Sequence, residues 1–180
     1  MTLTEKALRV AVTAHKEQVR KSDGSPYVVH PIMVSLILKE YGFDEVTIAA
    51  GITHDVLEDT DITRDVLAEA LGEDVAKIVD GVSEDMALEW EIRKEEYAKS
   101  VGAADESTKA VSIADKIHNA ESVIHDYQEK GKDVWKVFNR GKDKKLWFEN
   151  LIYSEVSKTW QHPIMDRYRM AIDMMEKLEE

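Results

Sequence analysis

The sequence predicts an all-α fold in a single domain, and three observations lead to this prediction. Apolar residues recur at helical spacing along most of the chain, and no segment alternates convincingly as a strand does. The length of 180 residues suits one domain with a sizeable core. The chain is 43% hydrophobic and 33% charged, as soluble globular proteins are. We expect one domain over residues 1–180, with the motifs in residues 7–126 and helices over 132–180 completing the bundle.

Composition excludes several classes of function. The net charge of −12 argues against nucleic-acid binding, which needs a basic surface. The chain has no cysteine, so thiol catalysis, disulfides and thiolate zinc sites are excluded. The N-terminus lacks the pattern of a signal peptide, and no apolar run approaches the ~20 residues of a membrane span. We therefore expect a cytoplasmic protein without membrane or nucleic-acid partners, whose oligomeric state the sequence leaves open.

The first helix is predicted over Thr4 to about Arg20, with His15 on its buried stripe, where a packed core histidine is the more common interpretation than a site residue. Turn-forming residues follow at 23–26. Pro31 is well placed to begin the next helix, because proline is favoured at the first helical position. His30 then stands directly before that helix, either as a surface cap or as a ligand that points into a cleft.

The stretch of residues 48–60 is unusual because an apolar helix, capped by Asp44, ends in a group of polar side chains. These are His54, Asp55, Glu58 and Asp59. Residues three or four apart share a helix face, and such groups are costly to bury without compensation. A divalent cation would compensate them. Since adjacent residues splay by about 100° on a helix, the ion must lie at the helix edge and take two further ligands from elsewhere. Within this helix, Gly51 would permit close packing of the backbone.

A long helix is predicted over Glu106–Tyr127, with Asp115 on its apolar side. Alone, Asp115 could be a structural hydrogen-bond partner, but beside a His-Asp pair it is the natural remaining metal ligand. Asn119 lies one turn further on the same face, where it can bind a polar group of a substrate. Lys116 is predicted to point away, by about 100° around the helix.

Two groups of cations could bind an anion. Arg93 and Lys94 lie in a charged segment over residues 89–100. A second cluster, of three lysines within residues 142–145, is followed by Trp147 and Phe148. Cations beside an aromatic ring can hold a phosphorylated nucleotide by charge and stacking. The more common interpretation of both groups is a salt-bridged, solvated helix face. The second cluster consists of Lys142, Lys144 and Lys145.

The pattern His30, His54-Asp55 and Asp115 resembles that of the HD superfamily of metal-dependent phosphohydrolases. The surrounding segments narrow the resemblance: R-K followed by P-Y-V-V-H-P, then H-D-V-L-E-D-T, then A-D-K-I-H-N. They resemble the hydrolase domain of the RelA/SpoT alarmone enzymes and the stand-alone small alarmone hydrolases, such as the Mesh1-like enzymes. The resemblance runs in order from about Ala7 to Ser122.

This resemblance implies an HD-type helical bundle and one manganese ion, Mn²⁺, held by His30, His54, Asp55 and Asp115. It implies that Glu58 and Asp59 position the metal-bound water or carry its proton. The implied reaction is hydrolysis of the 3′-diphosphate of (p)ppGpp to GDP or GTP and pyrophosphate. The implied contacts to this small-molecule nucleotide are Arg20, Lys21, Ser22, Tyr27, Asn119, Lys144 and Trp147.

Two other functions remain open at the level of sequence. One is an HD phosphohydrolase for another nucleotide or cofactor, such as NADPH losing its 2′-phosphate. The other is a non-enzymatic nucleotide sensor or partner-binding module, against which the presence of Glu58 and Asp59 argues. Iron accepts the same ligands as manganese. Glu121 stands where the family often has arginine, and we expect this carboxylate to repel a nearby phosphate.

Overall fold

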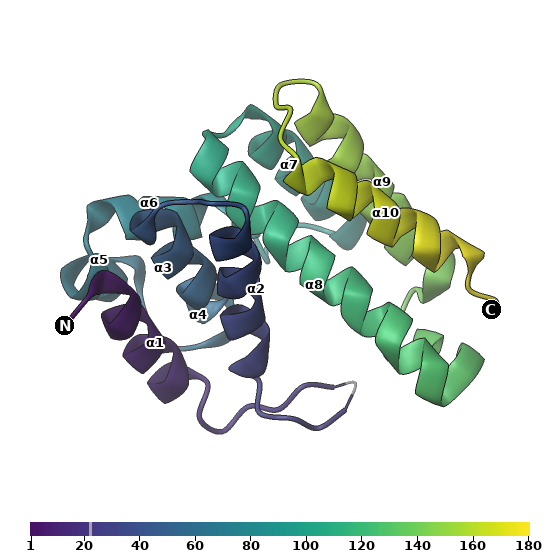
Figure 1. The fold of residues 1–180 in the computed structure, drawn as a ribbon, viewed down its shortest axis with the longest axis horizontal. Helices are drawn as coiled ribbons and strands as arrows, with labels where there is room; N and C mark the ends of the chain where they lie inside the picture. Colours follow the sequence, from purple (N-terminus) through teal and green to yellow (C-terminus); the bar gives the residue numbers. More distant parts are fainter. Residues whose placement is uncertain (22) are drawn as a thin grey trace.

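The computed structural model describes residues 1–21 and 23–180, and helices dominate them (Figure 1). Within these residues the only β-type pairing is an isolated antiparallel bridge between Val19 and Pro26. The all-α prediction is therefore confirmed. The elements are α1 (Leu3–Ala14), α2 (Val29–Glu40), α3 (Glu45–Thr53), α4 (Val56–Asp59), α5 (Arg64–Leu71), α6 (Glu73–Gly81), α7 (Trp90–Ala103), α8 (Glu106–Lys130), the 3₁₀ helix η1 (Gly131–Val137), α9 (Gly141–Ser157) and α10 (Ile164–Lys177).

The long helix α8 lies at the centre of the fold. It packs against α2 and α3 on one side and against α10 and η1 on another, and it crosses the molecule between the two groups of shorter helices (Figure 1). The larger core cluster contains buried side chains from α1 through α10, and a smaller one joins α8, η1 and α10. None of the described helices is long and apolar enough to cross a membrane.

Side-chain caps set several helix starts. Asp44 Oδ1 accepts a hydrogen bond from the Thr47 backbone N–H at 2.8 Å, as predicted for the start of α3. Asp105 caps α8 in the same way, through the Thr108 N–H at 2.9 Å. Such caps satisfy N–H groups that have no partner within the helix.

Three predicted helix boundaries are corrected by the structure. α1 ends at Ala14 instead of about Arg20, because His15 caps it and its Nδ1 meets Gln18 Oε1 at 2.7 Å as the chain turns away. α2 begins at Val29, so His30 lies in its first turn and not before it. α8 continues beyond Tyr127 to Lys130.

From the sequence, residues 48–60 were expected to form one continuous helix. The structure divides this stretch into two helices. α3 ends at Thr53, and the short helix α4 begins at Val56, so His54 and Asp55 occupy the junction. His54 Nδ1 bonds to the Gly51 carbonyl at 2.9 Å, which holds the ring against the end of α3. His54 and Asp55 keep helix-like backbone angles at this junction, and their side chains reach the same point, with Asp55 Oδ2 3.1 Å from His54 Nε2.

At Gly51, α3 packs tightly against side chains of α2. A Cβ atom built on Gly51 would overlap Leu38 Cδ1 on α2 and would lie 3.4 Å from Val34 Cγ1. The prediction of close packing at this glycine is thus confirmed. Since α2 carries His30 and α3 leads into His54, this contact lies between the elements that position the two histidines.

Candidate metal site and adjoining cavity

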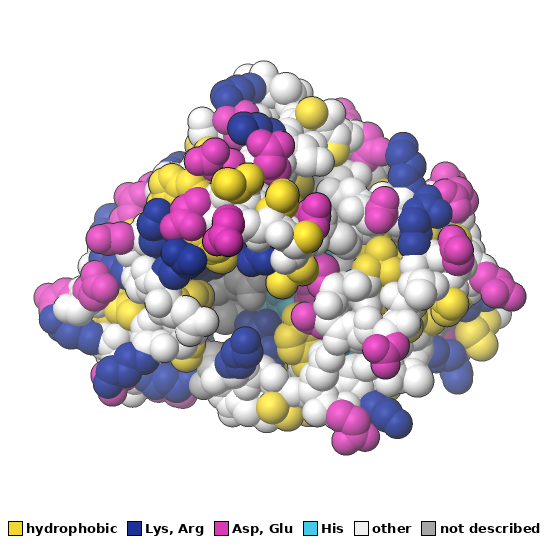
Figure 2. Space-filling view, turned by 180° about the vertical axis from the view of Figure 1, so that it is seen from behind, with side chains coloured by type: hydrophobic (Ala, Val, Ile, Leu, Met, Phe, Trp, Pro, Cys, Tyr) yellow, Lys and Arg dark blue, Asp and Glu magenta, His cyan; other side chains and the backbone are white. Residues whose placement is uncertain are grey.

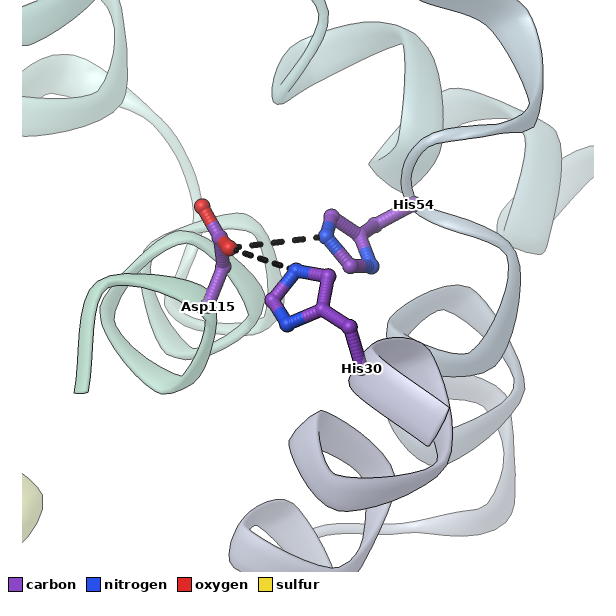
Figure 3. Close-up of side chains that lie close together, drawn as sticks. All are labelled: His30, His54 and Asp115. Carbon is purple, nitrogen blue, oxygen red and sulfur yellow. Dashed lines mark ion pairs between the residues drawn. The ribbon is translucent and has the colours of Figure 1, made fainter. Parts of the chain in front are cut away.

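His30, His54 and Asp115 converge from three different helical elements (Figure 3). Their ligand atoms all lie within 4.8 Å of one another, and all three residues are buried. Asp115 Oδ1 lies 3.0 Å from His30 Nε2 and 3.6 Å from His54 Nε2. The motif residues, up to 85 positions apart in the chain, therefore meet at one point.

Asp55 reaches the same point from the junction between α3 and α4. Its Oδ2 lies 3.1 Å from His54 Nε2 and 3.6 Å from His30 Nε2. The Tyr27 hydroxyl donates a hydrogen bond to this oxygen at 2.6 Å. The structure thus brings together all four residues that the sequence analysis named as metal ligands.

The donor set fits a divalent cation. Among the described residues, the buried His54 Nε2 has no partner in hydrogen-bond geometry, which is costly unless another group contacts it. Two imidazole nitrogens and two carboxylates form a nitrogen and oxygen set that suits manganese or iron.

Further side chains form hydrogen bonds with two of these four residues, His30 and Asp115. His30 Nδ1 lies 2.7 Å from His118 Nδ1, so one of these two nitrogens donates to the other. The Asn119 amide donates to Asp115 Oδ1 at 2.6 Å. Partners of this kind fix the ring orientation and basicity of metal-ligating residues.

Lys116 is a residue whose position the sequence analysis predicted wrongly. Its Nζ lies 2.8 Å from Asp115 Oδ2, and it packs over the rings of Tyr97 and Phe148. The α-carbon of Lys116 does lie around the helix from Asp115, but the four-carbon side chain folds back to the carboxylate. The only available sequence signal was its adjacency to an inward-facing aspartate.

The charged side chains of the cluster act strongly on one another's pKa values. Burial opposes the charged form of Asp115, yet Lys116, His30 and His54 hold the pKa of that carboxyl well below its usual value. Burial also opposes imidazolium formation at His54, but the Asp55 and Asp115 carboxylates raise the pKa of His54 well above its ordinary value. Burial lowers the pKa of His30. The site is therefore strongly attractive to positive charge.

A cavity of about 600 Å³ adjoins this cluster. Tyr27 connects the two, because its hydroxyl bonds to Asp55 while its side chain lines the cavity. The face opposite to that of Figure 1 is hollowed, with Lys and Arg side chains beside the hollow and a histidine visible within it (Figure 2). The cavity is lined by Gln18, Val19, Arg20, Lys21, Tyr27, Asp59, Asn119, Ser122, Val123, Asp126, Val134, Val137, Phe138 and Lys145.

Comparison with known families agrees with this geometry. Residues 7–143, which include the four clustered side chains, match the family described as HD domain. The chain belongs to the HD-domain family.

Curated relatives of this HD-domain chain include much longer proteins. It is 36% identical over 135 residues to the guanosine-3′,5′-bis(diphosphate) 3′-pyrophosphohydrolase of Aquifex aeolicus, covering 73% of this chain and 19% of that protein. It is 34% identical over 127 residues to a probable GTP pyrophosphokinase of Mycobacterium leprae, covering 68% of this chain and 16% of that protein. The chain thus spans a fifth or less of the length of these two relatives.

Two solved structures share the HD-domain fold along most of the chain. One is lmo0812 of Listeria monocytogenes, with 32% identity and a TM-score of 0.77, covering 82% of this chain and 99% of that chain. The other is described as a metazoan ortholog of SpoT that hydrolyzes ppGpp and plays a role in starvation responses. It has 24% identity and a TM-score of 0.81, and it covers 99% of this chain and 98% of that chain.

The two predicted catalytic carboxylates of this HD-domain chain lie on α4, directly after the metal cluster. Glu58 Oε1 accepts a hydrogen bond from the Glu84 backbone N–H at 2.7 Å. Partial burial raises the pKa of Glu58, and burial together with Asp55 raises that of Asp59. Asp59 lines the cavity, whereas Glu58 does not.

Four of the predicted substrate contacts, Arg20, Lys21, Tyr27 and Asn119, line the cavity together. Arg20 also lies 3.5 Å from both Asn119 Oδ1 and Ser122 Oγ. The predicted contact at Ser22 lies outside the described residues.

Lys144 and Trp147 are not brought to this cavity. Lys144 Nζ lies 3.4 Å from Glu91 Oε1 and packs over the rings of Trp90 and Trp147. Lys145, one position further on α9, lines the cavity instead. Sequence alone did not show which lysine of the cluster would face the cavity.

The other two groups of interest are paired. Arg93 Nε lies 2.9 Å from Glu84 Oε2, and Lys94 pairs with the same carboxylate. The expected ion pairing is found, but the expected solvated face is not, because these side chains are 9–15% exposed. Glu121 is bound by Arg167 of α10 through two hydrogen bonds of 2.7 and 2.9 Å. The carboxylate of Glu121 is thus neutralised and does not line the cavity.

Proposed function

We propose that this protein is a manganese-dependent phosphohydrolase that removes the 3′-diphosphate of (p)ppGpp, giving GDP or GTP and pyrophosphate. The observation that supports the proposal most directly is the position of Tyr27, which connects the four candidate metal ligands to a cavity large enough for a nucleotide. Membership of the HD-domain family and the names of the curated relatives support the same reaction. We further propose that the protein acts in the cytoplasm on this small-molecule substrate.

His30, His54, Asp55 and Asp115 would hold the metal ion. When bound, a divalent ion lowers the pKa of a coordinated water towards neutrality and polarises a phosphoryl oxygen. The coupled charges of the cluster favour this binding, since the pKa of Asp115 lies well below its usual value and the carboxylate stays ionised.

Glu58 and Asp59 would orient the attacking water and accept its proton. Their raised pKa values move both carboxyl groups towards the range in which a general base is most effective. In the reaction, the water oxygen bonds to the phosphorus attached to the ribose 3′ oxygen. The bond from that phosphorus to the 3′ oxygen breaks, this oxygen takes a proton, and pyrophosphate leaves.

The cavity would hold the rest of the nucleotide. Arg20 and Lys21 supply local positive charge within a protein of net charge −12, and Asn119 offers an amide beside them. Phe138 and Val137 offer an apolar wall against which a base can stack.

The test is hydrolysis of ppGpp by purified protein with added manganese, with NADPH and ATP as competing substrates and a chelator control. Release of GDP and pyrophosphate only in the presence of metal is the expected result. If metal is bound but only NADPH is turned over, the substrate proposal is wrong. Iron and magnesium in place of manganese test the identity of the ion.

Two variants separate metal binding from chemistry. Asp55→Ala should lose metal and activity together, because it removes a ligand. Glu58→Gln should retain metal and lose turnover, because it removes a base but no ligand. A fully active Glu58→Gln protein would contradict the role of Glu58 in activating water.

A further inference from the structure

One face of α8 forms a wall of the cavity and runs away from the metal cluster. The residues on it are Asn119, Ser122, Val123 and Asp126, spaced as neighbours on one helix face. Asp115, the metal-site carboxylate, precedes Asn119 by one turn on the same helix. Asp126 therefore lies about 16 Å further along the helix axis from Asp115, at 1.5 Å per residue. A nucleotide whose 3′-diphosphate lies at the cluster would place its base towards Asp126.

Asp126 is an unusual residue for this position, because a carboxylate so deeply buried is normally well paired. Its exposed fraction is 5%, and it borders both this cavity and a neighbouring one. Its ion pair with Lys130 Nζ is 3.5 Å long, whereas a charge-assisted hydrogen bond measures about 2.7–2.9 Å. The carboxylate thus retains capacity to accept further hydrogen bonds from a ligand.

The surroundings of Asp126 suit the flat face of a purine. Val134, Val137 and Phe138, from η1 and the residue after it, also line this cavity. An apolar wall excludes water from a bound base, and an aromatic ring stacks on it. With water excluded, the polar groups along the edge of the base can form hydrogen bonds only with the protein. A base whose polar groups lack such partners binds more weakly.

We propose that Asp126 determines base specificity by reading the guanine edge. This inference rests on the proposed function for the identity of the reaction but makes its own prediction about binding. An ionised carboxylate is an acceptor only, so it matches two adjacent donors. Guanine presents such a pair, N1–H and the 2-amino group. Hypoxanthine lacks the 2-amino group, xanthine places a carbonyl oxygen there, and adenine has an acceptor at N1.

The test compares binding of guanosine, inosine and xanthosine 5′-diphosphates to the full-length chain by calorimetry. Wild-type protein should prefer the guanosine ligand over the other two by about 5- to 150-fold, the range for a bidentate contact to a base. Asp126→Asn should lose this preference and gain affinity for the xanthosine ligand. The asparagine amide can donate to the xanthine oxygen while its carbonyl accepts from N1–H.

Glu129→Gln is the matched control, because it removes one negative charge from an exposed position on the same helix. It should retain the wild-type order of ligands. Equal binding of the three ligands by wild-type protein, or no binding of any, would overturn the inference without recourse to a variant. An Asp126→Asn protein that keeps the wild-type order would overturn it as well.

Failure of the proposed function has a different signature. Guanine preference in binding, without hydrolysis of ppGpp, would overturn the reaction and leave the role of Asp126 standing. Hydrolysis of the 3′-diphosphates of guanosine and inosine at equal kcat/KM, with equal binding, would overturn the role of Asp126 and leave the reaction standing.

Discussion

Lys116 Nζ lies 2.8 Å from Asp115 Oδ2, while the other carboxylate oxygen, Oδ1, meets His30 Nε2 at 3.0 Å. The two oxygens of one metal-site carboxylate are therefore divided between a fixed cation and the metal cluster. This division limits rotation of the carboxylate and compensates its charge when no ion is bound. Asp115 raises the pKa of Lys116 well above its ordinary value despite burial, so the cation persists at all physiological pH values.

Lys116→Met is expected to destabilise the metal-free protein by about 3–5 kcal/mol, because it leaves Asp115 buried without its cation. Saturating manganese should reduce this deficit, since the ion supplies positive charge to the same carboxylate. Denaturant unfolding with and without metal measures both values. Lys136→Met, at an exposed position, is the control and should behave as wild type. Equal deficits with and without metal would show that Lys116 has only a packing role.

The four residues of the candidate metal site could be predicted from the sequence because their identity depends on residue type and order. His30, His54, Asp55 and Asp115 carry the HD pattern, and the structure gathers all four. The all-α class was predictable for a similar reason, since apolar periodicity is a local property of the chain. The N-cap at Asp44 was predictable as well, because the cap bonds only three residues ahead.

The rest of the site depends on features that a regular helical wheel does not contain. His54 and Asp55 lie at the junction between α3 and α4, and their side chains meet there although they are adjacent in the chain. Lys116 reaches Asp115 by the length of its side chain and not by its position around the helix. The choice of Lys145 over Lys144 as a cavity residue depends on the packing of α9, which is a long-range property.

Gly51→Ala should destabilise the protein by about 1–3 kcal/mol, as overpacking of a core usually does. The added methyl group overlaps Leu38 Cδ1, so the buried Leu38 side chain or the α2–α3 contact has to shift. Because α2 carries His30 and α3 precedes His54, the proposed manganese affinity should fall as well. Unfolding and metal titration measure the two effects.

Leu38→Val provides the matched test of this contact, because it removes the overlapping carbon atoms. Combined with Gly51→Ala, it should cost less than the sum of the single changes, as residues in direct contact are coupled. If the destabilisations of the two single variants simply add in the double variant, the effect of Gly51→Ala arises in the helix backbone and not at the contact with Leu38.

Glu121→Gln tests whether the acidic residue at this position repels the substrate. In the structure, Arg167 binds both carboxylate oxygens of Glu121 and also lies 2.9 Å from Glu40 Oε2. We therefore expect KM for ppGpp to remain unchanged and thermal stability to fall slightly, since a partly exposed ion pair contributes about 0–1 kcal/mol. A marked decrease in KM would show that Glu121 does repel the substrate phosphate, as the sequence alone suggested.

Glu84→Gln should shift the pH dependence of activity. Burial raises the pKa of Glu58, and the nearby Glu84 carboxylate raises it further. A general base acts in its ionised form, so activity is present above this pKa and lost as pH falls through it. Glu84→Gln removes the negative neighbour and releases Arg93 and Lys94 from their shared partner. Both changes lower the pKa of Glu58, so the acid limb of kcat/KM should move to lower pH.

The hydrogen bond from the residue 84 backbone N–H to Glu58 is retained in Glu84→Gln, so the position of Glu58 is preserved. Glu95→Gln removes the same charge from an exposed site on α7 and should leave the acid limb in place. The profile is measured at saturating manganese, so that protonation of the ligands contributes equally to all three proteins. An acid limb that does not move in Glu84→Gln would assign the ionisation that controls activity to a group other than Glu58, with Asp59 the next carboxylate to test.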